Sequence, residues 1–332
     1  MRIHFLTTDQ KIADETAHFL KEWESDQDFI LQSTSGSTGS PKTIKIEKEK
    51  MIASARMTGD FFNLSKGKKA LLCISPSYIG GKMMIVRSLL YEMELYATMI
   101  SSKPLQNLNE PIDFAAMVPL QVSETIENQP EKLNLIKHLI IGGAPVSRKL
   151  AEALQQFNCN AYSTYGMTET VSHIALKNLG GQEQAFKGIG NTTFETKNGS
   201  LVIHSPELEI ESLETNDIVK LENEKEFHWL GRSDFTINTG GVKVQPEMIE
   251  DKLSLILPKD SFIISSIPDE KLGSKVILIA EEKIKALIDP SIFVDYLDRF
   301  EIPREVFFVE ELIKTASGKV DRISTTQLID GI

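Results

Sequence analysis

Hydroxyl and glycine residues gather in one short stretch near the N-terminus, TSGSTGSPK at residues 34–42. Backbone N–H groups beside glycine can approach phosphate oxygens closely, and the hydroxyl groups add further donors. The alternating TIKI of residues 43–46 predicts a strand directly after the loop. The stretch therefore differs from a Walker loop, which ends in Gly-Lys-Ser/Thr and opens a helix. Alone, it fits a Ser/Gly turn between two strands as well as it fits a phosphate-binding loop.

Two later segments combine carboxylate, hydroxyl and cationic side chains. In YGMTET at residues 165–170, Glu169 could hold Mg²⁺ against phosphate oxygens and the Tyr165 ring could cover an adenine. Residues 231–234 read GRSD and residues 239–243 read TGGVK, so an Arg-x-Asp that could anchor a ligand stands near two glycines. Taken singly, the first segment is better explained as a turn at the end of a strand, and the glycine pair as a linker between domains.

Alternating apolar runs and helical patterns between residues 68 and 165 predict the scaffold for these segments. The runs ALLCIS, LYATMI, DFAAMV and HLIIGG predict strands, whereas KMMIVRSLLYEM, QVSETIE and RKLAEALQQF predict helices. This alternation is typical of an α/β fold with a doubly wound, mostly parallel sheet, whose ligand crevice lies beyond the carboxyl ends of the strands. Beyond residue 170, strands separated by turns predict an antiparallel β unit packed beside that sheet.

The last hundred residues predict a small α+β domain. A helix is expected from Pro246 through residue 257, followed by the strands FIISSI and KVILIA, a helix over residues 292–300 and the strand VFFVEEL. A chain of 332 residues exceeds the usual size of one hydrophobic core, so we expect two domains, at residues 1–232 and 233–332.

Composition narrows the classes of partner and compartment. The formal net charge of −11 argues against wide contact with nucleic acid or an anionic membrane, because such partners need a positive field. Cys73 and Cys159 each lie in an apolar stretch, which indicates reduced core thiols rather than a disulfide or a metal site. The N-terminus carries acidic residues and no long apolar run occurs, so we expect a cytoplasmic protein that is neither secreted nor inserted in a membrane.

The segments above, together with KTASGKVDR at residues 314–322, resemble in type, order and spacing the adenylate-forming superfamily of acyl-CoA synthetases, adenylation domains and luciferases. The resemblance covers nearly the whole chain and implies a small, mobile C-terminal domain. It implies that a carboxylate attacks the α-phosphorus of ATP with Mg²⁺ bound, and that coenzyme A then takes the acyl group. The closer resemblance, carried by YGMTETVSH, by GGVK and by the small size, is to ligases that act on an aromatic dicarboxylic acid in menaquinone biosynthesis.

The resemblance also implies roles for individual residues. It assigns the ATP phosphates to Ser35, Gly36, Ser37, Thr38, Gly39 and Lys42, and the backbone along the adenine and acyl group to Gly142, Gly143 and Ala144. It assigns adenine to Tyr165 and Gly166, phosphate to Thr168, Mg²⁺ to Glu169, and ribose or α-phosphate to Asp217 and Arg232. It assigns the domain hinge to Asp234, the pantetheine arm of coenzyme A to Gly240 and Gly241, and the adenylation step to Lys319.

The sequence departs from the superfamily pattern at three places. The usual Thr-Gly-Asp is Thr-Asn-Asp at residues 215–217, a mild change because asparagine tolerates positive φ. The phosphate loop begins near residue 34, so most of the usual N-terminal subdomain is missing. Part of the acyl-pocket wall and of the coenzyme A surface is then either absent or supplied by a second protomer, which makes a homodimer a hypothesis. The aromatic-His pair expected near Tyr78 lacks its histidine.

Recognition of a second carboxylate on the acid requires a cation. Lys82 and Arg87 follow Tyr78 in the segment that borders the acyl pocket in relatives, although a loop cap and a surface helix residue explain them equally well. His173 either holds a substrate carboxylate or packs in a strand, and packing is slightly favoured. Three alternatives stay open: another aryl- or acyl-CoA ligase, an adenylation enzyme that loads a carrier-protein phosphopantetheine in place of coenzyme A, and a non-catalytic nucleotide-binding relative. Retention of Lys319, Glu169, Asp217 and Arg232 together argues against the last.

Overall fold

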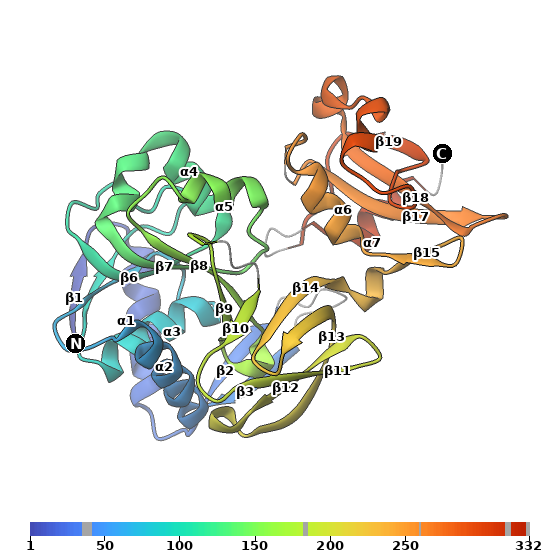
Figure 1. The fold of residues 1–332 in the computed structure, drawn as a ribbon. Coiled ribbons are helices and arrows are strands. Elements are labelled where there is room, and N and C mark those ends of the chain that lie inside the picture. The colour runs from blue at the N-terminus through green and yellow to red at the C-terminus, as the bar shows by residue number, and fades with distance from the viewer. Residues whose placement is uncertain (35–41, 182–184, 259, 316–319, 330–332) are drawn as a thin grey trace.

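The computed structural model describes residues 1–34, 42–181, 185–258, 260–315 and 320–329. Six parallel strands form one half of a large sheet in the order β1-β5-β4-β6-β7-β8 (Figure 1). They are β1 (Arg2–Phe5), β4 (Lys69–Leu72), β5 (Glu94–Ala97), β6 (Ile112–Met117), β7 (Ile136–Ile141) and β8 (Asn160–Gly166). The predicted parallel sheet is confirmed.

Helices cover both faces of this parallel half. Along β4, Ala70 and Leu72 belong to the apolar core beneath α1 (Gln10–Glu24), α2 (Lys48–Phe62) and α3 (Ile79–Leu90). Leu71 points the opposite way, into a second core shared with α4 (Pro119–Asn128) and α5 (Arg148–Leu154). Successive side chains of a strand alternate between faces, so a continuous apolar run is what a strand buried on both sides requires.

The sequence predicts an antiparallel unit packed beside the parallel sheet. In the structure, the antiparallel strands instead continue that same sheet. Strand β8 pairs with β9 (His173–Asn178) in antiparallel register, with Tyr165 opposite Ala175, and the order continues β9-β10-β14-β13-β12-β11. The remaining strands are β10 (Phe186–Gly188), β11 (Thr193–Lys197), β12 (Ser200–Ser205), β13 (Ile210–Asn223) and β14 (Glu226–Arg232). These twelve strands therefore form one continuous hydrogen-bonded sheet.

The strands before and after the hydroxyl-rich segment pair with each other, apart from the large sheet. Strands β2 (Phe29–Thr34) and β3 (Lys42–Glu47) pair antiparallel from Phe29 opposite Glu47 to Thr34 opposite Lys42. The predicted strand after the loop is thus confirmed, which separates this loop from the Walker type.

Helix α1 gives the N-terminal segment an anchor of its own. The Asp9 side chain accepts a hydrogen bond from the backbone N–H of Lys11 and so caps the first turn. Ile12, Thr16 and Phe19, spaced four and three residues apart, form the buried stripe of the helix. The chain therefore covers this face of the sheet itself, and the expected homodimer stays a prediction.

A second sheet of five strands lies after β14, with its own apolar cores. It consists of β15 (Ile237–Thr239), β16 (Val242–Val244), β17 (Phe262–Asp269), β18 (Gly273–Glu281) and β19 (Glu305–Val309), accompanied by α6 (Pro246–Leu253) and α7 (Arg322–Gln327). The prediction of a helix over residues 292–300 was wrong, because the structure has only a short 3-10 helix here, Pro290–Asp295. Phe293 and Leu297 reach the core from successive turns, and β-branched Val294 disfavours a longer helix.

Candidate active site

Glycines at the carboxyl ends of β7 and β8 allow backbone segments to lie in close contact. A Cβ on Gly142 would stand 2.3 Å from Oγ1 of Thr164, and one on Gly166 would stand 2.3 Å from the carbonyl oxygen of Ser172. Gly143 has φ of +82°, a conformation that favours glycine, and Ala144 follows it. These predicted residues therefore lie together where the parallel half of the sheet ends.

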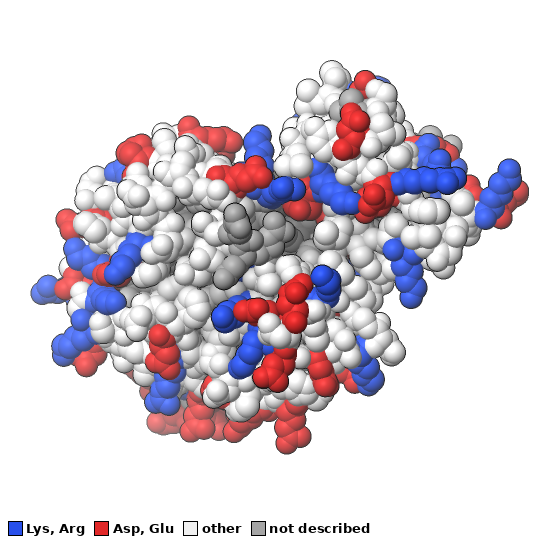
Figure 2. Space-filling view, viewed as in Figure 1, with Lys and Arg blue, Asp and Glu red and all other residues white. Residues whose placement is uncertain are grey.

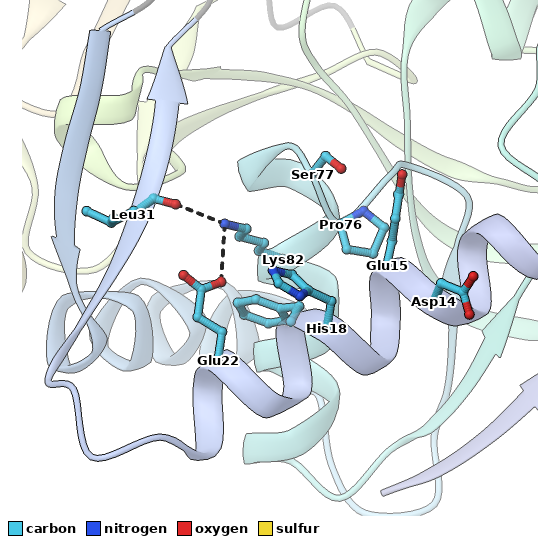
Figure 3. A pocket seen from close by; sticks show the side chains of 9 residues that line it. Asp14, Glu15, His18, Glu22, Leu31, Pro76, Ser77 and Lys82 are labelled. Atoms are coloured by element: carbon cyan, nitrogen blue, oxygen red, sulfur yellow. Dashed lines mark hydrogen bonds and ion pairs between the residues drawn. The ribbon is translucent and has the colours of Figure 1, made fainter.

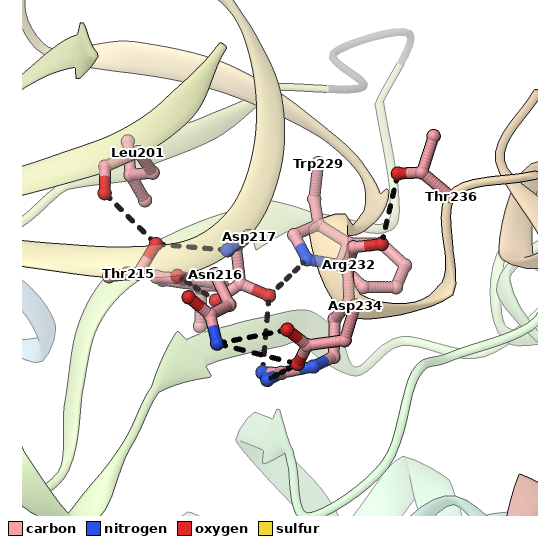
Figure 4. Close-up of polar contacts among 9 residues, drawn as sticks. Leu201, Thr215, Asn216, Asp217, Trp229, Arg232, Asp234 and Thr236 are labelled. Carbon is pink, nitrogen blue, oxygen red and sulfur yellow. Dashed lines mark hydrogen bonds and ion pairs between the residues drawn. The ribbon is translucent and has the colours of Figure 1, made fainter. Parts of the chain in front are cut away.

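Asp217 is the centre of a polar network on β13 and β14. The Tyr165 hydroxyl donates to Oδ2 of Asp217 over 2.6 Å, and Nε1 of Trp229 donates to Oδ1 over 3.0 Å (Figure 4). Arg232 lies opposite Asp217 in the strand register, with its guanidinium 4.0 Å from Oδ1. Burial, and then the charge of Asp217, raise the pKa of Tyr165 well above its usual value, so the phenol stays a donor.

The same network extends to Asp234 in the turn after β14. A guanidinium nitrogen of Arg232 pairs with Oδ2 of Asp234, and the Asn216 amide donates to both carboxylate oxygens over 3.1 and 3.4 Å (Figure 4). The structure thus brings Tyr165 and Asp217 together with Arg232 and Asp234, from three separate segments of the sequence.

Thr168 and Glu169 occupy the single 3-10 turn Thr168–Thr170 after β8. Glu169 is exposed and makes no hydrogen bond or ion pair within the described parts of the chain, which leaves both carboxylate oxygens available to a hard cation such as Mg²⁺. Val171 follows with φ of +64° and ψ of −53°, and the N–H of Ser172 donates to the carbonyl of Thr170 over 2.7 Å. This is a γ-turn, which is strained for a β-branched residue.

Arg87 is almost completely enclosed, with 1% of its surface exposed. One guanidinium nitrogen donates to Oγ of Ser172 over 3.1 Å, Nε has no hydrogen-bond partner, and no carboxylate pairs with it among the described residues. Burial lowers the pKa of Arg87 to about 9, which still leaves it charged at neutral pH. A buried cation without a counter-ion is costly to the fold, so its surroundings favour an anionic ligand.

His173 connects this cation to α2. Its Nε2 lies 3.2 Å from the Thr58 hydroxyl, which also bonds the carbonyl of Ser54, and its Nδ1 lies 3.4 Å from Oγ of Ser172. If Thr58 donates to Ser54, the imidazole donates from Nε2 and accepts the Ser172 proton at Nδ1, so that each hydroxyl makes one donor bond. Burial, and then the charge of Arg87, hold the pKa of His173 well below its usual range.

Lys82 lies on a different surface, in a cavity of about 510 Å³ between α1 and the start of α3 (Figure 3). Its Nζ donates to the carbonyl of Leu31 over 3.2 Å and lies 3.7 Å from the carboxylate of Glu22. The charge of Lys82 is therefore matched by Glu22, whereas no carboxylate in the described part of the chain pairs with Arg87. Tyr78, just before α3, is 54% exposed.

Gly240 and Gly241 form the turn of the β15–β16 hairpin. Their φ values are +60° and +82°, as a two-residue turn between antiparallel strands requires. Both are exposed, and they form a hairpin turn rather than a linker between the two sheets.

Several predicted residues cannot be placed. Ser35, Gly36, Ser37, Thr38, Gly39 and Lys319 lie outside the described residues, and Lys42 is described only by its position in β3. Lys314 and Val320, which flank the Lys319 segment, form a β-bridge.

Sequence reasoning missed Trp229, Asn216, Ser172 and Thr58 as parts of these networks. Strict period-two alternation would place Trp229 on the face opposite to Asp217, because Asp217 pairs with Arg232 three residues further along. The register shift between Ile218 and Val219 moves Trp229 opposite Val219, on the Asp217 face, and nothing in the sequence marks that bulge. Nothing in the sequence marks Thr58, which lies inside a helix.

Charge is mixed on the molecular surface. Figure 2 shows Lys and Arg interspersed with Asp and Glu over the face viewed, without a broad basic patch. No helix among the described residues has the length and apolar character needed to span a bilayer.

Comparison with known proteins identifies the family. The AMP-binding enzyme family matches residues 4–208, which is more than half of the chain. The chain belongs to the AMP-binding enzyme family. An acyl-CoA synthetase (AMP-forming)/AMP-acid ligase II-like protein of Dyadobacter fermentans is 32% identical, with a TM-score of 0.63 over 97% of this chain and 95% of that one.

Other relatives of this AMP-binding enzyme are more distant. A 2-succinylbenzoate–CoA ligase of Bacillus cereus is 24% identical over 95% of this chain and 73% of its own length. The O-succinylbenzoate coenzyme A synthetase of Bacillus subtilis, solved with ATP and magnesium ion, is 19% identical, with a TM-score of 0.75 over 89% of this chain and 69% of its own. At that identity the likeness shows the shared fold.

Proposed function

We propose that this AMP-binding enzyme is an ATP-dependent acid–CoA ligase whose acid is o-succinylbenzoate. The observation that carries the choice of acid is Arg87, a buried cation with no carboxylate of its own among the described residues. An acid with two carboxylates can place one against Arg87 and Ser172 while the other reacts. The names of relatives from Bacillus cereus and Bacillus subtilis agree with this chemistry.

The nucleotide would lie across the ends of β7 and β8, with its ribose at Asp217. Both Asp217 oxygens already accept one hydrogen bond, from Tyr165 and from Trp229, which holds the carboxylate in a single orientation and leaves further lone pairs for the ribose hydroxyls. Because Tyr165 packs edge-on against Phe227, its ring is fixed as a wall for the adenine.

Glu169 supplies hard oxygen ligands that fit Mg²⁺, which neutralises phosphate charge when bound. In the first step the free carboxylate oxygen of the acid attacks the α-phosphorus of ATP, the bond to the β-phosphate oxygen breaks, and pyrophosphate leaves. Lys319 would offset the negative charge that develops in this step. In the second step the coenzyme A thiol attacks the acyl carbon, AMP leaves, and the thiol proton passes to solvent.

The runner-up keeps the first step and transfers the acyl group to a carrier-protein phosphopantetheine, but no described feature favours it. The acidic composition and the two buried free thiols, Cys73 and Cys159, support the cytoplasm as the compartment. The homodimer is also proposed, and sedimentation of the active protein at low concentration tests it.

The deciding experiment measures AMP and pyrophosphate release with and without coenzyme A, comparing o-succinylbenzoate with benzoate, a fatty acid and amino acids. Release that requires coenzyme A and is fastest by far with o-succinylbenzoate supports the proposal. Release of AMP only when a carrier protein replaces coenzyme A would favour the runner-up, and ATP binding without AMP formation from any acid would contradict both.

A further inference from the structure

Asn216 lies on β13, in Thr-Asn-Asp at residues 215–217, and its side chain has a specific contact. The amide nitrogen lies 3.1 Å and 3.4 Å from the two carboxylate oxygens of Asp234. This contact is a tie that connects β13 to the turn Ser233–Phe235 that leads into the second sheet.

The tie lies on the path that links the two parts of the chain. Asp234 comes two residues after Arg232, which ends β14, and three residues before Ile237, which begins β15. Arg232 pairs with the same Asp234 carboxylate, so this turn is held to the large sheet from two strands at once (Figure 4). A rotation of residues 235–332 about residue 234 must either break the bonds of the Asp234 carboxylate to Asn216 and Arg232 or leave that carboxylate in place.

A second contact fixes the approach of α6 to β14. Gly231 has φ of +150°, and a Cβ there would stand 2.7 Å from Oε2 of Glu247 on α6. The backbone N–H of Arg232 also faces the Glu247 carboxylate, and burial raises the pKa of Glu247. The first helix after the turn is therefore seated directly on the strand before it.

We propose that Asn216 is a positioning residue that holds residues 233–332 in the orientation seen here, by fixing the Asp234 carboxylate through its amide. Asn216 and Asp234 are exposed, so each hydrogen bond is individually weak. An equilibrium between two domain orientations responds to small differences, and loss of this tie should shift it by about threefold to tenfold. The inference rests on the proposed two-step reaction for its kinetic readout alone.

The test measures domain orientation without catalysis. Dyes attached at Thr196→Cys on β11 and Ser291→Cys beyond β18, both exposed positions, report the distance between the two parts. The native thiols Cys73 and Cys159 are buried, and burial raises the pKa of each to about 12, so they do not compete for the dyes.

Asn216→Ala and Asn216→Gly should each broaden the distance distribution and enlarge its minor population by about threefold to tenfold. Asn191→Ala, at an exposed asparagine between β10 and β11, is the matched control and should leave it unchanged. In the Asp234→Asn background the effect of Asn216→Ala should shrink, because the carboxylate that it fixes is gone. An unchanged distribution in Asn216→Ala, or an equal effect in both backgrounds, would overturn the inference.

Kinetics add a second readout. Asn216→Ala should alter the ratio of pyrophosphate exchange into ATP to thioester formation by a similar factor while the folded fraction stays the same. A ratio equal to that of the native chain contradicts the inference. If no acid supports AMP formation, the proposed function fails, whereas the distance measurement still judges Asn216.

Discussion

The indole of Trp229 donates a hydrogen bond of 3.0 Å to Oδ1 of Asp217, from the strand adjacent to the one that carries the carboxylate. Tyr165 holds the other oxygen from β8. Three strands therefore fix one carboxylate, which limits the rotamers that it can adopt when a nucleotide binds.

Trp229→Phe should weaken AMP binding by about tenfold, because the loss of one hydrogen bond to a charged group costs about 1.5 kcal/mol. Calorimetric titration with AMP measures this change. The chain has only two tryptophans, so fluorescence of the Trp23→Phe variant, which retains Trp229, should report nucleotide binding directly. Undiminished AMP affinity in Trp229→Phe would show that Tyr165 alone positions Asp217.

Arg87→Met should stabilise the fold and impair recognition of a dicarboxylate. The buried charge lacks a counter-ion among the described residues, so an apolar side chain of similar length should raise the free energy of unfolding by about 1 kcal/mol or more. The kcat/KM for o-succinylbenzoate should fall by about a hundredfold, with benzoate little affected. Denaturant unfolding and acid-dependent AMP release measure the two effects, and equal losses for both acids would remove Arg87 from the acyl site.

Lys82→Met should change the KM for o-succinylbenzoate and for benzoate to the same degree. Lys82 is paired with Glu22 and Leu31 and lies in the cavity beside α1, away from Ser172. Glu22→Gln serves as the matched variant, since it breaks the same pair from the other side. A rise in KM confined to the dicarboxylate would place Lys82 in the acyl pocket, as the sequence had first led us to expect.

Stability should fall below about pH 6.5 because of His173. Its pKa is held well below its ordinary value, so the unfolded chain binds a proton that the folded chain does not. The free energy of unfolding therefore decreases as the pH drops through this range. Thermal unfolding from about pH 7.5 to about pH 5 measures the loss, which His173→Gln should reduce. An equally steep loss in the variant would assign the effect to other groups.

Gly166→Ala should destabilise the fold by about 2 kcal/mol or more, because the new Cβ would stand 2.3 Å from the carbonyl oxygen of Ser172. Gly80→Ala is the matched control within α3, where the nearest atoms stand at 3.7 Å. It should stabilise the helix by about 0.5 to 1 kcal/mol. Denaturant unfolding of both variants measures the difference, and similar changes in the two would mean that the turn after β8 can relax.

The scaffold could be predicted because local patterns determine it. The runs from residue 68 to residue 165 alternate in period, and the TIKI strand after the loop follows from its own alternation. The continuity of the large sheet could not be predicted from the sequence. The pairing of β8 with β9 depends on the tight turn at Val171 rather than on the composition of either strand.

The candidate site was predicted where a residue's type announces its chemistry, as with Asp217 and Arg232. The hydrogen-bond partners of these side chains were not predicted, because they depend on the register between strands. Asn216 was interpreted only as a tolerated replacement for glycine, since its amide gains a partner eighteen residues later only once the chain is folded. Lys82 and Arg87 were indistinguishable until their burial and partners were known.

The γ-turn at Val171 has a consequence for how two substrates act on one another. Glu169, proposed to act on the phosphate side, and Ser172, proposed to act on the acid side, are separated by a single tight turn whose φ of +64° is disfavoured for valine. Such a short strained turn has little conformational freedom, so a displacement of the backbone at one end is transmitted to the other. Occupancy by nucleotide should therefore tighten binding of the acid, and Val171→Gly, which relieves the turn, should make the two substrates bind independently.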